Sequence, residues 1–295
     1  MTTEMDDGPP EALSDSVLDA AGEVRELATS GWPAGYVYGA TRYADVILRQ
    51  AFNDRSMDLI NALGQFRPTL TELRSGGGGR TVFVRRFDDS LAAMLEEDQA
   101  VWGKQNVSIS KELALDGTPL KTMRTRGHEI DMFGKGALDN PLPGIAVEME
   151  WNNKDPFFDR DLLSFQALHR EGVIAVGVII TRGPKLQSLI SKTIQSSDGG
   201  WKYGQSSTHW EKLLPKVNLG GGGECPLLLV GIEPGRVQGV ELALDVYEKL
   251  RQAEALKNNW RSLRPGKKWA EVKPEHGRML EQARDLMPPL RDENE

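Results

Sequence analysis

The sequence has very little cysteine and no long hydrophobic run. Its single cysteine, Cys225, excludes an internal disulfide and a metal cluster built from cysteines, and it suits a reducing cytoplasm. No apolar run approaches the roughly 20 residues that a membrane-spanning helix needs. The opening stretch MTTEMDDGPPEALSD lacks the basic and then apolar segments of a secretion signal. We therefore expect a cytoplasmic protein that does not contact a membrane.

The sequence also has fewer basic residues than acidic ones. Lysine and arginine number 36 against 43 aspartates and glutamates, so the net charge is −7. This balance argues mildly against nucleic-acid binding, because such proteins often present a basic surface. It does not exclude it, since net charge sums the whole surface whereas binding needs only one basic face. An enzyme that cuts nucleic acid with a metal ion must itself carry acidic residues.

Helix and strand patterns alternate through the middle of the chain. Residues 1–15 are acidic and carry prolines, which predicts disorder, and the pattern from 16 to 74 is mostly helical. The order of elements beyond residue 80 predicts an α/β core. Strands are expected at 80–87, 128–134, 144–151, 173–183 and 225–234, and helices at 88–103, 156–171 and 240–258.

Two glutamates stand where an apolar strand should be most buried, in the segment GIAVEMEW. Successive side chains of a strand point to opposite faces, so Glu148 and Glu150 share one face. Asp131 lies in the preceding strand, and it comes beside Glu148 if the two strands pair. Three carboxylates on one patch repel one another, which raises their pKa values or requires a cation. A hard divalent ion with oxygen ligands, above all Mg²⁺, fits such a patch.

A Glu-x-Glu pair is more often the solvated face of an amphipathic strand, and the motif alone leaves that interpretation open. The context favours a site. The strand is followed by WNNKDPFFDRD, in which Asp155 can cap a helix and Pro156 suits its first turn. The very apolar strand 173–183 comes next.

The segment from 128 to 183 resembles the catalytic core of type II restriction endonucleases of the BglII/BamHI kind, within the PD-(D/E)xK nuclease superfamily. The likeness extends more loosely through 207–213 and 220–233. It implies a restriction-endonuclease-like fold, a central mixed β-sheet flanked by helices, here with a helical N-terminal addition. The expected domains are an N-terminal helical segment 1–74, a catalytic core 80–255 and a C-terminal extension 256–295.

The resemblance also implies roles for the acidic residues. Asp131 would bridge the metal ions and Glu148 would be the second metal ligand. Glu150 stands where most of the superfamily has lysine, so no lysine can polarise the attacking water there. Glu150 would act as general base or hold the water through a metal. A further glutamate from the preceding helix serves the site in this family; the candidates are Glu96 and Glu97, with Glu112 and Glu129 as alternatives.

Two polar segments are candidates for DNA contacts. Asparagine can form two hydrogen bonds with adenine, and the resemblance puts Asn153 at a base-contacting position. The alternative is that Asn152 and Asn153 only make the turn before the helix, which we favour for Asn152. Lys154 either touches a phosphate or is solvated. The loop WKYGQSSTHW is either a surface loop pinned by its tryptophans or a second base-reading segment, with these candidates: Ser206, Ser207, Thr208 and His209.

These features favour one hypothesis over three others. The leading one is a homodimeric restriction endonuclease of a prokaryotic restriction–modification system, which uses Mg²⁺, with Mn²⁺ as a substitute, to cut double-stranded DNA at a short palindromic site and leave 5′-phosphate ends. The alternatives are a modification-dependent or repair nuclease, a DNA-binding protein with an inactive site, and, more distantly, a glycosidase with paired carboxylates. Basic residues at 121–126 and 182–185, and the run 257–269 with its two tryptophans, are either phosphate contacts or solvated faces.

Overall fold

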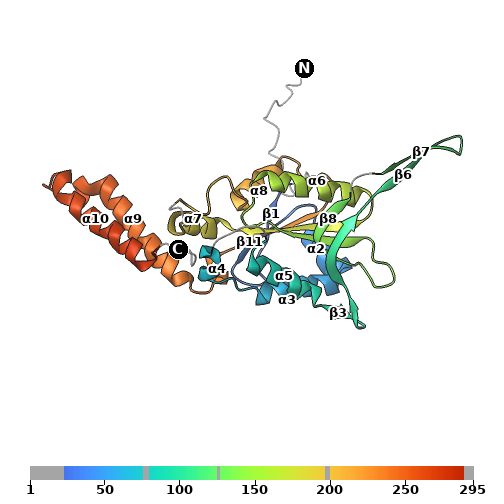
Figure 1. The fold of residues 1–295 in the computed structure, drawn as a ribbon, viewed down its shortest axis with the longest axis horizontal. Coiled ribbons are helices and arrows are strands. Elements are labelled where there is room, and N and C mark those ends of the chain that lie inside the picture. Colours follow the sequence, from blue (N-terminus) through green and yellow to red (C-terminus); the bar gives the residue numbers. More distant parts are fainter. Residues whose placement is uncertain (1–22, 76–79, 125–126, 197–199, 289–295) are drawn as a thin grey trace, which may run out of the picture.

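The computed structural model describes residues 23–75, 80–124, 127–196 and 200–288. Its core is a seven-stranded mixed sheet with helices on both faces, which confirms the predicted α/β fold (Figure 1). In spatial order the strands are β1 (Arg25–Glu26), β2 (Tyr36–Ala40), β11 (Leu227–Ile232), β10 (Ile174–Arg182), β9 (Gly144–Met149), β8 (His128–Gly134) and β5 (Trp102–Val107).

The centre of the sheet is its most apolar part. Strands β9, β10 and β11 run parallel, while β2 and β8 pair antiparallel with them on either side. Strand β10 is buried along nearly its whole length, as its sequence IAVGVIITR predicts for a strand covered on both faces. The strands predicted at 128–134, 144–151, 173–183 and 225–234 are therefore confirmed.

Each face of the sheet has its own buried cluster. The first cluster includes Leu63 and Phe83, and the second includes Phe158 and Trp210. None of the described helices is both long and apolar enough to cross a bilayer. The helices that pack into the first cluster include α2 (Ala44–Ala51), α3 (Asn53–Gln65), α4 (Leu70–Arg74), α5 (Val82–Ala92) and α7 (Pro184–Thr193); those of the second are α6 (Pro156–Arg170) and α8 (Trp210–Asn218).

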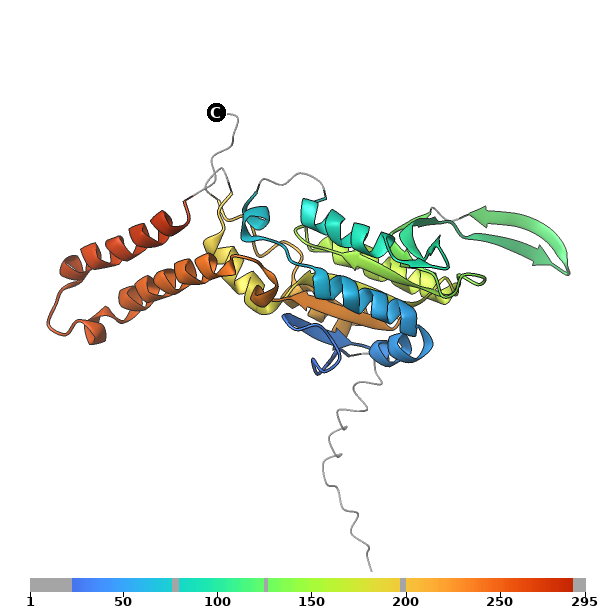
Figure 2. The ribbon, with the colours of Figure 1, turned by 90° about the horizontal axis from the view of Figure 1, so that it is seen from below.

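Two elements project from this core at opposite ends (Figures 1 and 2). One is a two-stranded ribbon of β6 (Ser110–Leu115) and β7 (Thr118–Arg124), whose described residues are all exposed. The other is a hairpin of two helices, α9 (Val240–Leu263) and α10 (Trp269–Leu286). The remaining elements are short: β3 (Leu95–Glu96), which pairs with β4 (Gln99–Ala100), and the 3₁₀ turn η1 (Pro234–Arg236).

The predictions for residues 80–103 are wrong. Most of the stretch predicted as a strand, 80–87, lies in helix α5, which begins at Val82, and the helix predicted over 88–103 ends at Ala92. Valine and phenylalanine give RTVFVRRF a strand-like composition. However, Phe83, Phe87 and Leu91 recur every four residues and are buried together, which is the pattern of one helix face.

The N-terminal segment is less helical than its pattern predicts. Helices α2 and α3 confirm the prediction for residues 43–66, but β1 and β2 are strands of the central sheet. Tyr36 and Tyr38 of β2 pack into the first cluster, so tertiary contacts decide the conformation of this stretch. The disorder predicted for residues 1–15 lies outside the described residues.

Candidate active site

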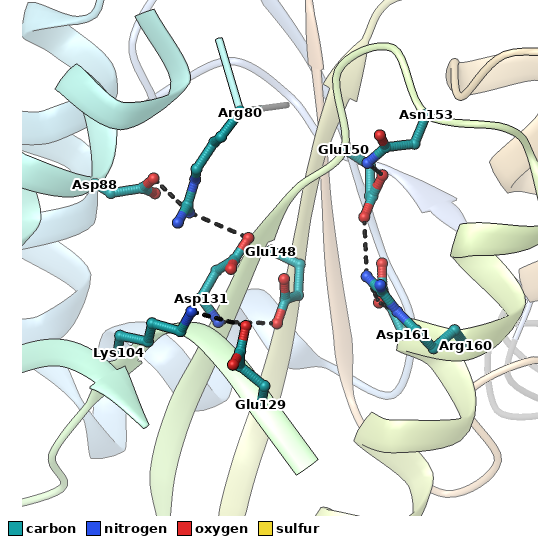
Figure 3. Close-up of polar contacts among 10 residues, drawn as sticks. All are labelled: Arg80, Asp88, Lys104, Glu129, Asp131, Glu148, Glu150, Asn153, Arg160 and Asp161. Carbon is teal, nitrogen blue, oxygen red and sulfur yellow. Dashed lines mark hydrogen bonds and ion pairs between the residues drawn. The ribbon is translucent and has the colours of Figure 1, made fainter. Parts of the chain in front are cut away.

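Strands β8 and β9 bring Asp131 and Glu148 together. Their pairing places Met132 opposite Val147, so the next pair along is Asp131 and Glu148. The backbone N–H of Asp131 donates a hydrogen bond to Glu148 Oε1 at 3.1 Å (Figure 3). The proximity expected from strand pairing is therefore present in the structure.

An irregularity in the sheet lies at Asp131 itself. Strand β5 pairs Gly103 with Phe133 and then Gln105 with Ile130. Between these two pairs β8 has two residues, one of them Asp131, whereas β5 has one. This is the residue count of a β-bulge, which bends a strand and re-aims the side chains beside it. Asp131 lies on the same face as Glu148 because residues directly opposite each other in paired strands share a face, and the bulge lets Ile130 lie on that face as well.

Glu148 and Glu150 share the sheet face that carries the second cluster. Their neighbours in sequence, Val147 and Met149, belong to the first cluster, as the alternation of side chains requires. Glu148 is only 6% exposed and Glu150 only 3%. Burial raises the pKa of Glu148 well above its usual value, and the charge of Asp131 raises it further. Burial likewise raises the pKa of Glu150 to about 8.

A further buried acid, Asp161, joins this face from α6 and was missed in the sequence. Burial raises its pKa, and its charge helps to raise the pKa values of both glutamates. Its Oδ2 atom is buried and has no hydrogen-bond partner among the described residues. The sequence did contain a signal for it. Asp161 lies on the apolar face of the helix, between Phe158 and Phe165, and an aspartate is rarely buried on such a face without a partner.

Two arginines neutralise the acids from opposite sides (Figure 3). Arg160 donates to Glu150 Oε1 at 3.2 Å and pairs with Asp161. Arg80 pairs with Asp131 at 3.1 Å and also with Asp88 of α5. Burial raises the pKa of Asp88 to about 7, although the charge of Arg80 opposes this. Asp88 is thus the acid that α5 supplies beside Asp131.

The glutamates expected from the preceding helix lie elsewhere. No hydrogen bond or ion pair in the described part of the chain joins any of them to Asp131 or Glu148. Their positions are as follows: Glu96 pairs with Arg55, Glu97 occupies a left-handed turn with φ of 48°, Glu129 pairs with Lys104 at 2.7 Å, and Glu112 is exposed on β6.

The donor set suits a hard divalent cation, because all its ligand atoms are carboxylate oxygens and one of them is a buried oxygen without a partner. Within the described residues, however, no three acidic, histidine or cysteine side chains converge closely enough to hold a metal ion. Arg80 and Arg160 instead provide the positive charge next to the acids. The acids are therefore paired with arginine side chains, and binding of a metal ion would require these side chains to rearrange.

The two segments expected to contact DNA lie side by side. Thr208 donates its backbone N–H to the carbonyl of Asn153 at 2.8 Å, and Asp155 donates to the carbonyl of Ser206 at 3.1 Å. The side chain of Asn153 donates to Glu150 Oε2 at 2.5 Å. The turn after β9 and the loop before α8 therefore form one surface, which is joined directly to the acidic residues.

Only part of this surface faces solvent. Ser207, Thr208 and His209 are buried, and the buried guanidinium of Arg182 donates to Ser207 Oγ at 2.6 Å and to the carbonyl of Thr208. Burial lowers the pKa of His209. These three residues thus form the underside of the surface. The exposed candidates are Asn152, Asn153, Lys154 and Ser206.

Comparison with known families agrees with this geometry. The sequence profile of the family described as restriction endonuclease BglII/BglIII matches residues 36–232, which is more than half of the chain and includes all the acids described above. A search of curated proteins found no match. Enzymes of such families act on double-stranded DNA and generally depend on a divalent metal ion. The chain therefore belongs to the BglII/BglIII restriction endonuclease family, and it is a type II restriction endonuclease that cleaves DNA site-specifically.

Proposed function

We propose that this endonuclease hydrolyses both strands of DNA at a short palindromic site, depends on Mg²⁺, leaves 5′-phosphate ends and acts in the cytoplasm as part of a restriction–modification system. Mn²⁺ would substitute for Mg²⁺. The observation that carries the proposal is the cluster on one sheet face, where Asp131 meets Glu148 across paired strands and Glu150 follows two residues later. Such a cluster of buried acids has no purely structural benefit, because desolvation and mutual repulsion destabilise it.

Asp131 and Glu148 are the residues that would hold Mg²⁺. When bound, the ion would neutralise the scissile phosphate and lower the pKa of a water molecule. We further propose Asp88, rather than Glu96 or Glu97, as the additional acid from the preceding helix. Asp88 reaches Asp131 through their shared partner Arg80, whereas Glu96 is paired with Arg55.

Glu150 is proposed as the general base. Its pKa of about 8 allows it to take up a proton near neutral pH, which is the property that a base needs. The side chains of Asn153 and Arg160 both donate to it, one to each oxygen, and they fix the orientation of the carboxylate. A lysine at this position, as in most of the superfamily, could not accept a proton while charged.

We place base recognition on the exposed residues Asn153 and Ser206, with Asn152 and Lys154 beside them. Because Asn153 also contacts Glu150, base contact and the orientation of the proposed base depend on the same side chain. A palindromic site is read by two matching subunits, so we also propose a homodimer. The outer side of α6 exposes Leu163 and Phe157, which suits an interface of this kind.

Digestion of unmethylated plasmid and phage DNA tests the proposal. Discrete fragments are expected with Mg²⁺, no cleavage with EDTA, and none with the Glu148→Ala protein. End labelling would then establish the 5′-phosphate and the cut position. If the folded protein leaves unmethylated DNA intact but cuts methylated DNA, the enzyme depends on modification and the proposed role in a restriction–modification pair is wrong.

A further inference from the structure

The α9–α10 hairpin lies beyond the region that the family profile matches. Its base is anchored in the core, because Val246 of α9 and Ala283 of α10 belong to the first cluster. Farther out, Leu256 and Val272 are buried between the two helices. Twenty-four residues of α-helix extend about 36 Å, so the anchored hairpin carries its far end well away from the sheet (Figure 2).

Basic and acidic residues are distributed unevenly along this hairpin. We call residues 257–278 the tip; it contains seven lysines and arginines and two glutamates. The rest of the hairpin, residues 240–256 and 279–288, contains three basic and six acidic residues. The tip is thus strongly positive on a protein whose net charge is −7. Seven of the ten cations of the hairpin therefore lie at one end, whereas six of its eight acids lie at the other.

Most cations of the tip have no acidic partner among the described residues. Arg264 pairs with Glu275, and the backbone of Lys268 is capped by Glu271. The indole of Trp260 lies 6.3 Å from that of Trp269, which joins the two helices at this end. The cations that are exposed and form no ion pair in the described chain are Lys257, Arg261, Lys267, Lys268, Lys273 and Arg278.

The composition of the tip fits DNA better than a second copy of the chain. Protein interfaces are poor in lysine and rich in buried apolar side chains, and here Val272 is already buried against the partner helix, which leaves Leu263 as the exposed large apolar side chain of the tip. Duplex DNA carries one charge per about 1.7 Å, and each lysine or arginine that neutralises a phosphate releases counterions. We propose that the tip binds the phosphate backbone of the DNA outside the recognition site. The proposal rests on the proposed cleavage of duplex DNA and extends it to the flanking sequence.

A charge-matched pair of full-length variants tests this. The tip variant carries Lys257→Gln, Lys267→Gln and Lys273→Gln, and the base variant carries Lys249→Gln, Arg251→Gln and Arg284→Gln. Binding is measured by fluorescence anisotropy in EDTA, on a duplex of about 12 base pairs that spans the mapped cleavage site and on one of about 40 with the same centre. Circular dichroism melting verifies that both variants are folded.

The tip variant should bind the long duplex about tenfold more weakly than the wild type at moderate salt, and its slope of log K against log[salt] should be smaller by about 3 for each tip that contacts the DNA. Binding to the short duplex and the rate of cleaving it should not change. The base variant should match the wild type on both duplexes. Equal behaviour of the two variants, or an equal loss on both duplexes, overturns the proposal. If the wild-type protein cleaves no DNA, the proposed function is refuted, regardless of how the tip variant binds.

Discussion

The acidic site and the tip of the hairpin use charge in opposite ways. Four acids of the site are buried and have pKa values raised by desolvation, and they come from α5, α6 and the end of β9: Asp88, Asp161, Glu148 and Glu150. The cations of the tip are exposed, come from one continuous segment, and keep their hydration. Charge that takes part in bond cleavage must be concentrated and shielded from water, whereas charge that only attracts a phosphate backbone can remain solvated. The difference explains why the acids need arginine partners and the tip does not.

Removal of a buried acid should have the largest effect. We expect Glu148→Gln to lower the cleavage rate by about 10³-fold or more, because the variant loses a proposed metal ligand. DNA binding in EDTA should persist, since no contact to DNA is removed. Single-turnover cleavage and anisotropy measure the two effects separately. Glu129→Gln is the matched control, because Glu129 is an exposed residue of β8, the strand that carries Asp131; a similar loss in that variant would contradict the buried site.

Asp88 tests whether the acid supplied by α5 belongs to the site. Asp88→Asn should lower the cleavage rate by about 10- to 100-fold, as is typical when a group that supports metal ligands is removed. Glu97→Gln, in the exposed turn after α5, should leave the rate unchanged. Titration of cleavage against Mg²⁺ should show a weaker apparent affinity only for Asp88→Asn. The opposite result would favour Glu97, which the sequence suggested.

The raised pKa of Glu150 predicts how stability depends on pH. The carboxyl titrates at about 8 in the fold, against about 4.3 in an unfolded chain. Between these values the folded state binds more protons than the unfolded state, so stability falls as pH rises through this window. In EDTA we expect the wild-type Tm to fall by about 5 °C between pH 5 and pH 8. Glu150→Gln cannot ionise, so its Tm should change less; identical slopes for the two proteins would show that Glu150 is not desolvated.

The smallest effects are expected from two serines near Asn153, one buried beneath the proposed DNA-contacting surface and one exposed on it. Ser207→Ala removes a buried hydrogen bond from Arg182 and should lower the free energy of unfolding by about 1 to 3 kcal/mol. Ser206→Ala changes an exposed side chain and should leave stability unchanged while it alters discrimination between cognate and single-mismatch sites. Urea unfolding and competitive cleavage measure these effects. A loss of stability in both variants would mean that Ser206 is also structural.

Regions differ in how well the sequence predicted them. The pattern of β8 to β10 and α6 was correct, because long apolar runs and a capped amphipathic stripe leave few alternatives. Residues 80–103 were misassigned, since aromatic and β-branched residues resemble a strand until their burial partners are known. Asp88 was missed for the same reason, because the helix that carries it was misassigned, whereas Asp161 lies on the correctly predicted stripe of α6 and its sequence signal was overlooked.

By itself the sequence determined the central strands, the placement of Glu148 and Glu150 on one face, and the likeness to restriction endonucleases. These depend on local alternation and on a motif carried by neighbouring residues. The tertiary structure decided which acids join Asp131, which arginines neutralise them, and that the Asn153 turn and the Ser206 loop form one surface. The pKa of an acid depends on desolvation and on charges from distant elements, and neither exists until the chain has folded.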